Sequence, residues 1–423
     1  MPAVSLPRGT RDLLPGEADA FEWLLAVHRR VASLHGYRPL ETPIFEQTEM
    51  FARGIGAGTD VVEKEMYTFP DPKDRSLSLR PENTPAAVRA VLGAHLTQEF
   101  RPVRVRYAGP MFRYDKPQHG RYRQFWQVGC ECIGERSPAL DVEVIEVAWR
   151  FFEALGLEGV VLQVNSLGDL DDRTRYRSAL VEYYTPLRER LCVDCKRRLD
   201  INPLRLLDCK VDAQFVEGAP KIADALSEES GTYFAHVLAG LEAAGIAHAV
   251  NPRLVRGLDY YAHTTFEFWH SSLQGAQNAL GGGGRYDGLA EVLGFSATPG
   301  AGYALGVDRI LIVASEQGIV PATPPVTDAL VCPVEPAQAL AAAAVARELR
   351  AAGVVTVLDA AERKLDKKLK ASDKLGARVA VIVGPDEVVT GTAAVRDLLA
   401  RTQESIPLTD VAAAVTRLLA NGG

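Results

Sequence analysis

A proline-rich stretch at residues 321–325 divides the sequence into two parts that follow different patterns. It reads Pro-Ala-Thr-Pro-Pro, and because adjacent prolines favour extended backbone, we predict a linker there. Beyond it, apolar runs and helical patterns alternate: we expect strands at residues 329–332, 354–358 and 379–383, and helices at residues 337–351 and 365–375. This alternation predicts a small α/β domain with a mostly parallel sheet over residues 326–423.

The part before the linker mixes helical and strand patterns. Apolar side chains with a helical period predict a helix at residues 20–34, and three strands are expected at residues 103–109, 125–132 and 160–164. Residues 170–245 differ, since they are charged and helical, with the clearest helix at residues 173–190. We therefore predict an α+β domain over residues 1–169 and 246–320 that a helical insertion interrupts.

Composition and charge limit the classes of partner. Of 423 residues, 47 are Lys or Arg and 54 are Asp or Glu, so the net charge is −7. Attraction of the whole protein to nucleic acid or to an anionic membrane is not expected, and any nucleic-acid contact must come from a local basic patch. The sequence has neither a signal-peptide pattern nor an apolar run of about 20 residues. We expect a cytoplasmic protein with no membrane partner.

A polar, basic loop joins the first two predicted strands. It carries Arg113, Lys116, Arg121 and Arg123, and arginine binds phosphate oxygens through two parallel hydrogen bonds. The loop could present these cations to a polyphosphate. It could equally be a solvated edge of the domain.

The strand after this loop has an unusual face. Alternation places Phe125, Gln127, Gly129 and Glu131 on one side of it. A polar face with one aromatic residue and one glycine packs poorly against a core, and it would suit the floor of a pocket. A solvent-facing edge strand is the alternative interpretation, which explains the charge but not Phe125 and Gly129.

Three further segments carry candidate ligand-binding residues. Residues 254–261 combine Arg, Asp and two Tyr beside a glycine, which suits hydrogen bonding to a ligand, although Tyr is equally common in a half-buried core. Residues 281–284 are all glycine and allow close approach of a ligand, or form a turn. A small-residue strand from residue 300 leads into a helix whose first turn holds Arg309, where an anion is favoured.

Taken in order, these segments resemble the class II aminoacyl-tRNA synthetases and, within them, the histidyl-tRNA synthetase family. Residues 8–12 are similar to the family's amino-terminal signature, and Pro43 stands where the first class motif has its dimer-interface proline. Residues 112–131 look like the second motif and residues 302–309 like the third. Residues 254–261 look like the segment peculiar to the histidine enzymes. The resemblance covers nearly the whole chain.

The resemblance implies a fold and an activity. The fold would be a class II α+β catalytic domain built on an antiparallel sheet, with the helical insertion and a carboxy-terminal α/β anticodon-binding domain. The activity would be that of a homodimeric ligase, which activates L-histidine with ATP and Mg²⁺ to histidyl-adenylate and transfers it to the 3′ end of histidine tRNA. A non-catalytic regulatory subunit of ATP phosphoribosyltransferase, or a class II synthetase for another amino acid, would be the alternatives.

The same resemblance assigns roles to single residues. Arg113 would hold the α-phosphate of ATP, with Phe125 and Arg309 on either side of the adenine. Arg256 would bridge the histidine carboxylate and the α-phosphate and stabilise the charge of the transition state. The α-ammonium group would be received by Glu82, Thr84 and Gln127. Glu131 and Tyr261 would read the imidazole nitrogens.

Two residues depart from the family pattern. Asn83 stands where the family has glycine, and we expect the loop to survive because Asn tolerates unusual backbone angles. Trp126 stands where the family has histidine. It alternates onto the face opposite Gln127, so we expect it to affect packing more than histidine recognition.

Contacts with tRNA are expected from two places. One is the basic loop, through Arg121 and Arg123, and the other is the basic run in the carboxy-terminal domain, through Lys367 and Lys368. The basic run is otherwise a solubilising surface, but an anticodon-binding domain would place such a helix beside an RNA loop.

The insertion holds three of the six cysteines, Cys192, Cys195 and Cys209. They could supply three thiolates to a zinc ion. No fourth ligand follows at zinc-ribbon spacing, so the sequence favours reduced thiols and no metal.

Overall fold

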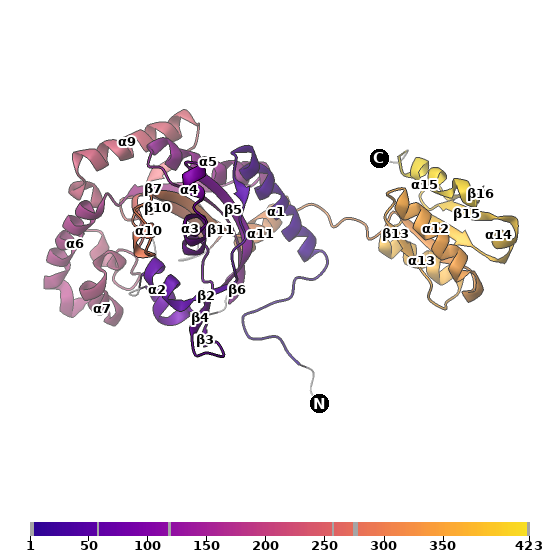
Figure 1. Ribbon diagram of the computed structural model, residues 1–423, viewed down its shortest axis with the longest axis horizontal. Coiled ribbons are helices and arrows are strands. Elements are labelled where there is room, and N and C mark those ends of the chain that lie inside the picture. The colour runs from indigo at the N-terminus through magenta and orange to yellow at the C-terminus, as the bar shows by residue number, and fades with distance from the viewer. Residues whose placement is uncertain (1–3, 57–58, 117–119, 256–257, 274–277, 421–423) are drawn as a thin grey trace. The chain divides into compact units, whose positions relative to one another are not determined.

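The chain folds into two compact units, Met1–Pro321 and Ala322–Gly423, which are treated separately below. The computed structural model describes residues 4–56, 59–116, 120–255, 258–273 and 278–420. Figure 1 follows the chain by colour through both units. Within the described ranges every helix is too short or too polar to cross a bilayer.

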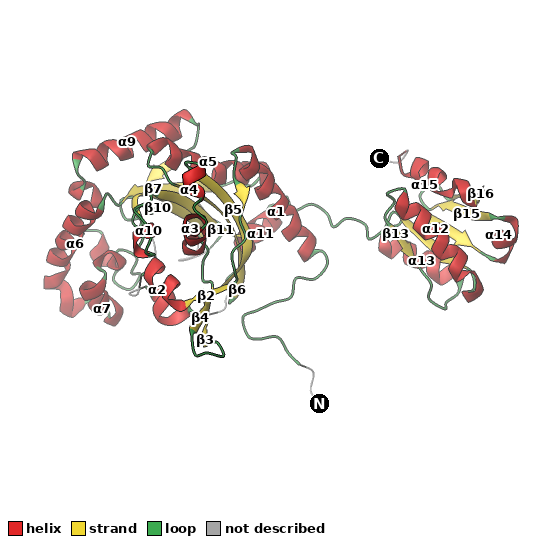
Figure 2. Ribbon diagram, viewed as in Figure 1, coloured by secondary structure: helices red, strands yellow, loops and turns green. Residues whose placement is uncertain are grey.

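A large sheet forms the centre of the first unit, as Figure 2 shows. It has eight strands. Its order is β1-β5-β6-β11-β10-β9-β7-β8, and only the two outermost pairs, β1 with β5 and β7 with β8, are parallel. The strands in sheet order are Arg38–Pro39, Val103–Phe112, Gln124–Ile133, Gly300–Gly306, Ala279–Arg285, Ala262–His270, Val160–Ser166 and His248–Val250. The predicted α+β domain on an antiparallel sheet is confirmed.

Strand β6 lies inside this sheet, between β5 and β11. Glu131 on β6 is opposite Val105 on one side and Gly302 on the other. The interpretation of residues 125–131 as a solvent-facing edge is therefore wrong. Strand β11 covers the second edge of β6, and because it is distant in the sequence, no local pattern could reveal this pairing.

Four helices cover one face of the sheet. They are α1 (Glu17–Leu34), α5 (Pro138–Leu155), α9 (Glu228–Ala243) and α11 (Val307–Glu316), and their buried side chains form one core with β6, β7, β9 and β11. Trp126 packs against this core, with its ring edge-to-face with Phe21 at 6.2 Å. This family departure therefore affects packing, as the alternation predicted.

The opposite face supports shorter elements. Buried side chains of α3 (Thr84–Gly93) and α10 (Leu289–Val292) pack with β5, and this core continues into the insertion. Beside them lie α2 (Thr48–Ile55), the π-helical turn η1 (Val61–Glu65), and α4 (Leu96–Glu99). A three-stranded sheet of β2 (Phe45–Gln47), β4 (Ser76–Leu79) and β3 (Thr68–Pro70) completes this side.

The insertion is helical, as predicted. Its elements are α6 (Leu170–Tyr184), η2 (Thr185–Arg190), α7 (Val193–Ile201), η3 (Pro203–Leu206), α8 (Ala213–Val216) and η4 (Ile222–Ala225). The predicted helix at residues 173–190 ends as an α-helix at Tyr184 and tightens into a 3₁₀ turn, because Pro186 has no N–H to donate. Helix α9 follows, but Val237 and Leu241 bury it in the core of the sheet. It therefore packs against the eight-stranded sheet rather than with the other helices of residues 170–245.

The second unit contains a five-stranded sheet of order β13-β12-β14-β15-β16. The strands are β12 (Ala329–Pro333), β13 (Thr356–Leu358), β14 (Val379–Val383), β15 (Thr392–Asp397) and β16 (Thr402–Pro407), and the helices are α12 (Ala339–Ala351), α13 (Leu365–Leu375), α14 (Pro385–Thr390) and α15 (Val411–Ala420). The first three strands pair in parallel as predicted, but β14–β15 and β15–β16 are antiparallel, so the sheet is mixed. The hairpin escaped prediction because β16 is polar and mostly exposed.

Candidate active site

A cavity of about 270 Å³ opens on the face of the sheet opposite α1 and α5. Segments from five places in the sequence line it. The lining residues are Glu82, Thr84, Arg113, Asp115, Gly120, Arg121, Tyr122, Phe125, Gln127, Leu258, Tyr261, Glu267, Ala279, Leu280, Gly281, Gly282, Ala304, Gly306, Asp308 and Arg309. Most of the residues predicted for nucleotide and amino-acid binding therefore line one pocket.

Three arginines make one part of this pocket cationic. Arg113 is fixed by a hydrogen bond from its Nε to the carbonyl oxygen of Pro81 at 2.9 Å, and its guanidinium lies 5.5 Å from the ring centre of Phe125. Arg309 Nη1 donates to the carbonyl oxygen of Ala279 at 2.7 Å. Burial lowers the pKa of Arg309, and Arg121 and Arg113 nearby lower it further. Such crowded cations favour a polyanionic ligand.

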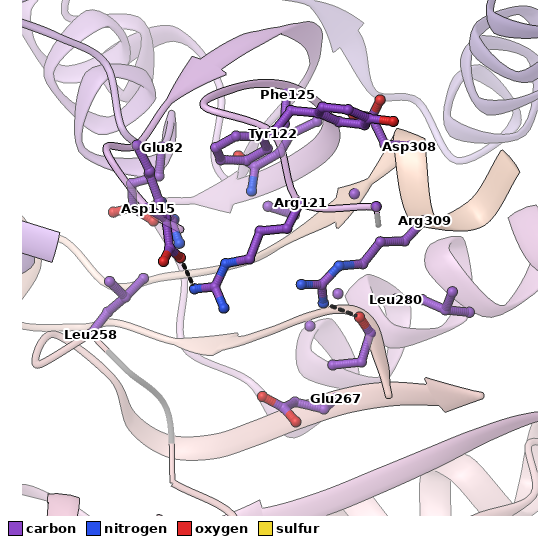
Figure 3. Close-up of a pocket in the computed structure, with 18 of the residues that line it drawn as sticks. Glu82, Asp115, Arg121, Tyr122, Phe125, Leu258, Glu267, Leu280, Asp308 and Arg309 are labelled. Carbon is purple, nitrogen blue, oxygen red and sulfur yellow. Dashed lines mark hydrogen bonds and ion pairs between the residues drawn. The ribbon is translucent and has the colours of Figure 1, made fainter. Parts of the chain in front are cut away.

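Figure 3 shows Arg121 and Arg309 directing their guanidinium groups toward the middle of the pocket. Arg121 pairs there with Asp115, which lies on the same loop. The sequence did not predict Asp115 as a site residue, yet its carboxylate is the partner of Arg121 in the pocket. An anionic ligand would compete with Asp115 for it.

The amino-terminal signature contacts two residues of the pocket lining, Asp308 and Tyr122. Arg11 Nη2 donates to Oδ1 of Asp308 at 2.8 Å, and its guanidinium lies 4.6 Å from the ring centre of Tyr122. The other carboxylate oxygen of Asp308 accepts the backbone N–H of Trp126 at 3.1 Å. Asp308 and Tyr122 thus connect the amino-terminal signature with the second and third motifs. Asp308 is next to Arg309 in the sequence, and Tyr122 lies within the basic loop. These positions were the sequence signals that could have indicated both as site residues.

A second part of the pocket carries groups suited to an ammonium and a polar ring. Glu82 and Thr84 lie just before and at the start of α3, Gln127 lies on β6, and Tyr261 ends the histidine-type segment, residues 254–261. The Oε1 of Gln127 is buried and has no hydrogen-bond partner among the described residues. A ligand N–H would satisfy this oxygen, since buried polar groups are normally paired.

Glu131 lies beneath the floor and is 0% exposed. Its Oε1 accepts hydrogen bonds from Thr84 Oγ1 at 2.7 Å and from Tyr107 at 3.2 Å, and its Oε2 accepts one from Tyr286 at 2.6 Å. Burial raises the pKa of Glu131 to about 8, although the hydroxyl donors oppose this shift. Glu131 does not line the pocket itself but bonds to Thr84, which does. The resemblance had suggested a direct contact between Glu131 and the imidazole.

Comparison with known proteins agrees with this geometry. A family model described as histidyl-tRNA synthetase matches residues 9–170 and 208–310, and an anticodon-binding-domain model matches residues 328–418. The chain belongs to the histidyl-tRNA synthetase family. A histidine–tRNA ligase of Pelotomaculum thermopropionicum is 45% identical over 407 residues, which cover 96% of each chain. One of Bacillus subtilis is 45% identical over 407 residues, or 95% of each chain.

Solved structures of histidyl-tRNA synthetases share the fold. The apo enzyme of S. aureus is 34% identical, has a TM-score of 0.83, and is matched over 98% of this chain and 100% of that one. A structure from Bacillus halodurans, described as an ATP phosphoribosyltransferase regulatory subunit/histidyl-tRNA synthetase, is 21% identical with a TM-score of 0.64 over 90% and 98% of the two chains. At that identity the likeness concerns the fold alone.

Some residues expected from the histidyl-tRNA synthetase pattern lie elsewhere. Arg123 stands outside the pocket, with its guanidinium 3.8 Å from the ring centre of Tyr114 and a hydrogen bond to the carbonyl oxygen of Arg8 at 3.2 Å. Arg256 falls outside the described residues. Asn83 needs no unusual backbone, since its φ is −110° and its Oδ1 accepts a hydrogen bond from Thr42 Oγ1 at 2.6 Å.

The two lysines predicted for tRNA binding have different environments. Lys367 is exposed on α13. Lys368 is only 2% exposed, and its Nζ donates to the carbonyl oxygen of Pro333 at 2.8 Å. The prediction for Lys368 is therefore corrected: its ammonium is committed to the core of its own unit, which helical periodicity did not reveal.

Proposed function

We propose that the protein is a histidine–tRNA ligase that activates L-histidine with ATP and transfers the histidyl group to the 3′ end of histidine tRNA. One observation carries the proposal: the pocket joins an arginine-rich part to a part lined by Glu82, Thr84, Gln127 and Tyr261. The first part suits a triphosphate and the second suits the ammonium and imidazole of histidine. Two substrates held side by side need little further ordering before they react.

ATP would occupy the cationic part. Arg113 would hold the α-phosphate, while Phe125 and Arg309 would enclose the adenine between a ring and a guanidinium. Arg121 would exchange Asp115 for a phosphate oxygen. The histidine carboxylate oxygen would attack the α-phosphorus as the bond to the β-phosphate oxygen breaks and diphosphate leaves.

Mg²⁺ would accompany ATP by binding its phosphate oxygens. Carboxylate oxygens are its preferred protein ligands, and the pocket offers several. Glu267 on β9 is a pocket carboxylate that we assign to the ion, and its Oε2 accepts a hydrogen bond from Trp269 Nε1 at 2.7 Å. When bound, Mg²⁺ would neutralise charge on the phosphates.

Histidine would occupy the polar part. Glu82, Thr84 and the unpaired Oε1 of Gln127 would receive the α-ammonium group. Tyr261 would meet the imidazole, and Glu131 would set the position and polarity of Thr84 and Tyr286 beneath it. Arg256 would stabilise the charge that develops as the carboxylate attacks, the role that the sequence resemblance assigns to it.

Transfer to tRNA would involve both units. The anticodon loop would contact the second unit, with Lys367 among the exposed cations of α13. Arg121 and Arg123 would contact the tRNA near its 3′ end. A homodimer and a cytoplasmic location complete the proposal. Support for the homodimer comes from an apolar surface beside Pro43, where Ile44, Phe45 and Phe69 are 42%, 52% and 39% exposed.

ATP–pyrophosphate exchange with each amino acid in turn tests the proposal. Exchange that requires histidine, followed by histidylation of histidine tRNA, is the expected result. Exchange with another amino acid would overturn the specificity. Absence of exchange with all of them would favour a regulatory subunit of ATP phosphoribosyltransferase.

Arg256→Ala separates binding from catalysis. It should slow adenylate formation by a factor of roughly a thousand and leave ATP affinity within a few-fold, because the arginine acts on charge that appears only in the transition state. Equal losses in both quantities would contradict that role. Pre-steady-state adenylate formation and equilibrium ATP binding are the two measurements.

A further inference from the structure

Four potential metal ligands meet in the insertion, away from the pocket. Cys192 precedes α7, Cys195 lies in its first turn, Cys209 follows η3, and Asp212 precedes α8. One ligand atom from each residue lies within 4.8 Å of the other three. Zinc-ribbon spacing predicts only the three cysteines as ligands, because an aspartate three residues after Cys209 does not fit that pattern.

We propose that Cys192, Cys195, Cys209 and Asp212 bind a structural zinc ion. The Sγ atoms of Cys192 and Cys209 are 3.8 Å apart. A tetrahedral zinc ion about 2.3 Å from each sulfur separates two sulfurs by about 3.8 Å. Three thiolates and a carboxylate form a closed, four-coordinate ligand set that zinc accepts, and thiolates disfavour Mg²⁺ and Ca²⁺.

The separation of the Cys192 and Cys209 sulfur atoms does not fit a disulfide bond. Its sulfur atoms lie about 2.05 Å apart, far less than the separation of Cys192 and Cys209. The Sγ of Cys209 is also 3.9 Å from Oδ2 of Asp212, so that sulfur faces a carboxylate as well as a thiol. The largest spacing among the four ligand atoms exceeds the tetrahedral value by only about 1 Å.

The burial of Asp212 is a second, independent observation. Its side chain is 4% exposed, and within the described ranges it forms no ion pair with Lys, Arg or His. Buried carboxylates are normally paired with a cation or bound to a metal. The facing side chains are thiols, and a dication among them would supply the missing charge.

Hydrogen bonds from the backbone orient the candidate ligands. The N–H of Cys192 donates to both carboxylate oxygens of Asp212, at 3.2 and 3.0 Å. The N–H of Cys195 donates to Sγ of Cys192 at 3.4 Å. Around them, Leu191, Leu199 and Phe215 are buried in the same core. A dry surrounding and fixed ligands are what a structural metal site requires.

The site would anchor the helix that joins the insertion to the pocket wall. From α7, Arg198 pairs with Asp60 at 3.0 Å, and just beyond its end Asn202 Nδ2 donates to Asp259 Oδ1 at 2.6 Å. Asp259 belongs to the histidine-type segment that contributes Leu258 and Tyr261 to the pocket. By fixing α7, zinc would stabilise the segment around Asp259 that lines the histidine side of the pocket.

Elemental analysis of the full-length protein tests the proposal. The protein should be purified without chelators and with its affinity tag removed, because a histidine tag binds metals. We expect one zinc ion per chain. Cys209→Ser and Asp212→Ala should each reduce that amount, whereas Cys332→Ser, which changes a buried cysteine in the other unit, should keep it.

Cobalt substitution of the natural chain gives a readout that does not depend on the variants folding. After removal of bound metal, added Co²⁺ should give the intense visible bands of a tetrahedral site and a thiolate-to-cobalt absorption in the near ultraviolet. A chain that binds neither Zn²⁺ nor Co²⁺ in this way would overturn the proposal. A disulfide between Cys192 and Cys209, detected by mass spectrometry of the alkylated protein as purified, would also overturn it.

Discussion

The phenolic hydroxyl of Tyr260 donates a hydrogen bond to Oε2 of Glu82 over 2.9 Å, and both side chains are buried. The two residues are 178 positions apart in the sequence. This bond ties the histidine-type segment to the loop before α3, which we propose as the ammonium site. It fixes the direction of a carboxylate that must face the substrate.

Tyr260→Phe should therefore weaken histidine binding more than ATP binding. A hydrogen bond to a charged group contributes about 1.5–3 kcal/mol, so the KM for histidine should rise by roughly tenfold or more, while the KM for ATP stays within about twofold. Pyrophosphate exchange with each substrate varied separately gives both values. Tyr37→Phe is the matched control, since Tyr37 is also buried and its hydroxyl bonds to Glu143, outside the pocket. A similar rise in the control would contradict the argument.

Glu131 should make stability depend on pH. Its pKa is about 8 in the folded protein, against an ordinary value of 4.5, and burial is the main cause. The folded state thus keeps a proton that the unfolded chain releases, so this contribution is fully present below about pH 4.5 and is lost as pH rises through about 8. Glu131→Gln stays neutral and should show a shallower fall in Tm over that window.

Thermal unfolding from about pH 5 to pH 8.5 checks this expectation. Glu22→Gln serves as the control, because Glu22 is exposed on α1. If the wild type, the control and Glu131→Gln all follow the same curve, Glu131 is not protonated in the folded protein at neutral pH.

Gly302 leaves room for the Glu131 carboxylate. A Cβ atom at residue 302 would lie 1.6 Å from Oε2 of Glu131, whereas one at Gly306, on the same strand, would meet its nearest atom at 3.6 Å. Gly302→Ala must displace a buried, triply hydrogen-bonded carboxyl. We expect it to destabilise the protein by several kcal/mol or to abolish soluble expression, with Gly306→Ala nearly neutral. Urea unfolding of the two variants compares them, and equal midpoints would refute the steric argument.

Substitution of Lys367 should weaken tRNA binding, whereas substitution of Lys368 should lower the stability of the protein. Lys367→Ala removes an exposed cation, so the KM for tRNA should rise a few-fold and depend less on salt, while pyrophosphate exchange, which needs no tRNA, stays unchanged. Lys368→Ala leaves the carbonyl of Pro333 without its donor and should cost about 1–3 kcal/mol of stability. Arg347→Ala, an exposed cation on α12, controls for loss of charge. The reverse assignment of effects would contradict the structure.

The exposed apolar surface beside Pro43 should govern self-association. The rings of Phe45 and Phe69 meet edge-to-face at 6.4 Å and face solvent in the single chain. The double variant Phe45→Glu and Phe69→Glu should convert a dimer to a monomer in analytical ultracentrifugation. Phe100→Glu changes a phenylalanine that is 65% exposed elsewhere and should leave the dimer intact. A wild-type monomer at micromolar concentration would rule out the proposed interface.

Local patterns in the sequence determined which segments are strands and helices and which chemical groups they carry. Residues 103–109 and 125–132 alternate clearly enough to locate β5 and β6, and the motif order indicated the family. These signals are readable because strand and helix periods are set by backbone geometry within a few residues. The sequence did not predict strand β16, because its residues are polar and mostly exposed and show no apolar alternation.

Only the tertiary structure decided what surrounds each group. Glu131 is a buried carboxyl with a raised pKa because β5, β11 and Gly302 enclose β6, and Lys368 is a core donor because α13 packs against β12. Asp212 joined the three cysteines through a fold of the insertion that no ligand spacing predicted. The sequence by itself determined the order of motifs and the family; burial and long-range contact were decided by packing, because they depend on residues that are distant in the chain.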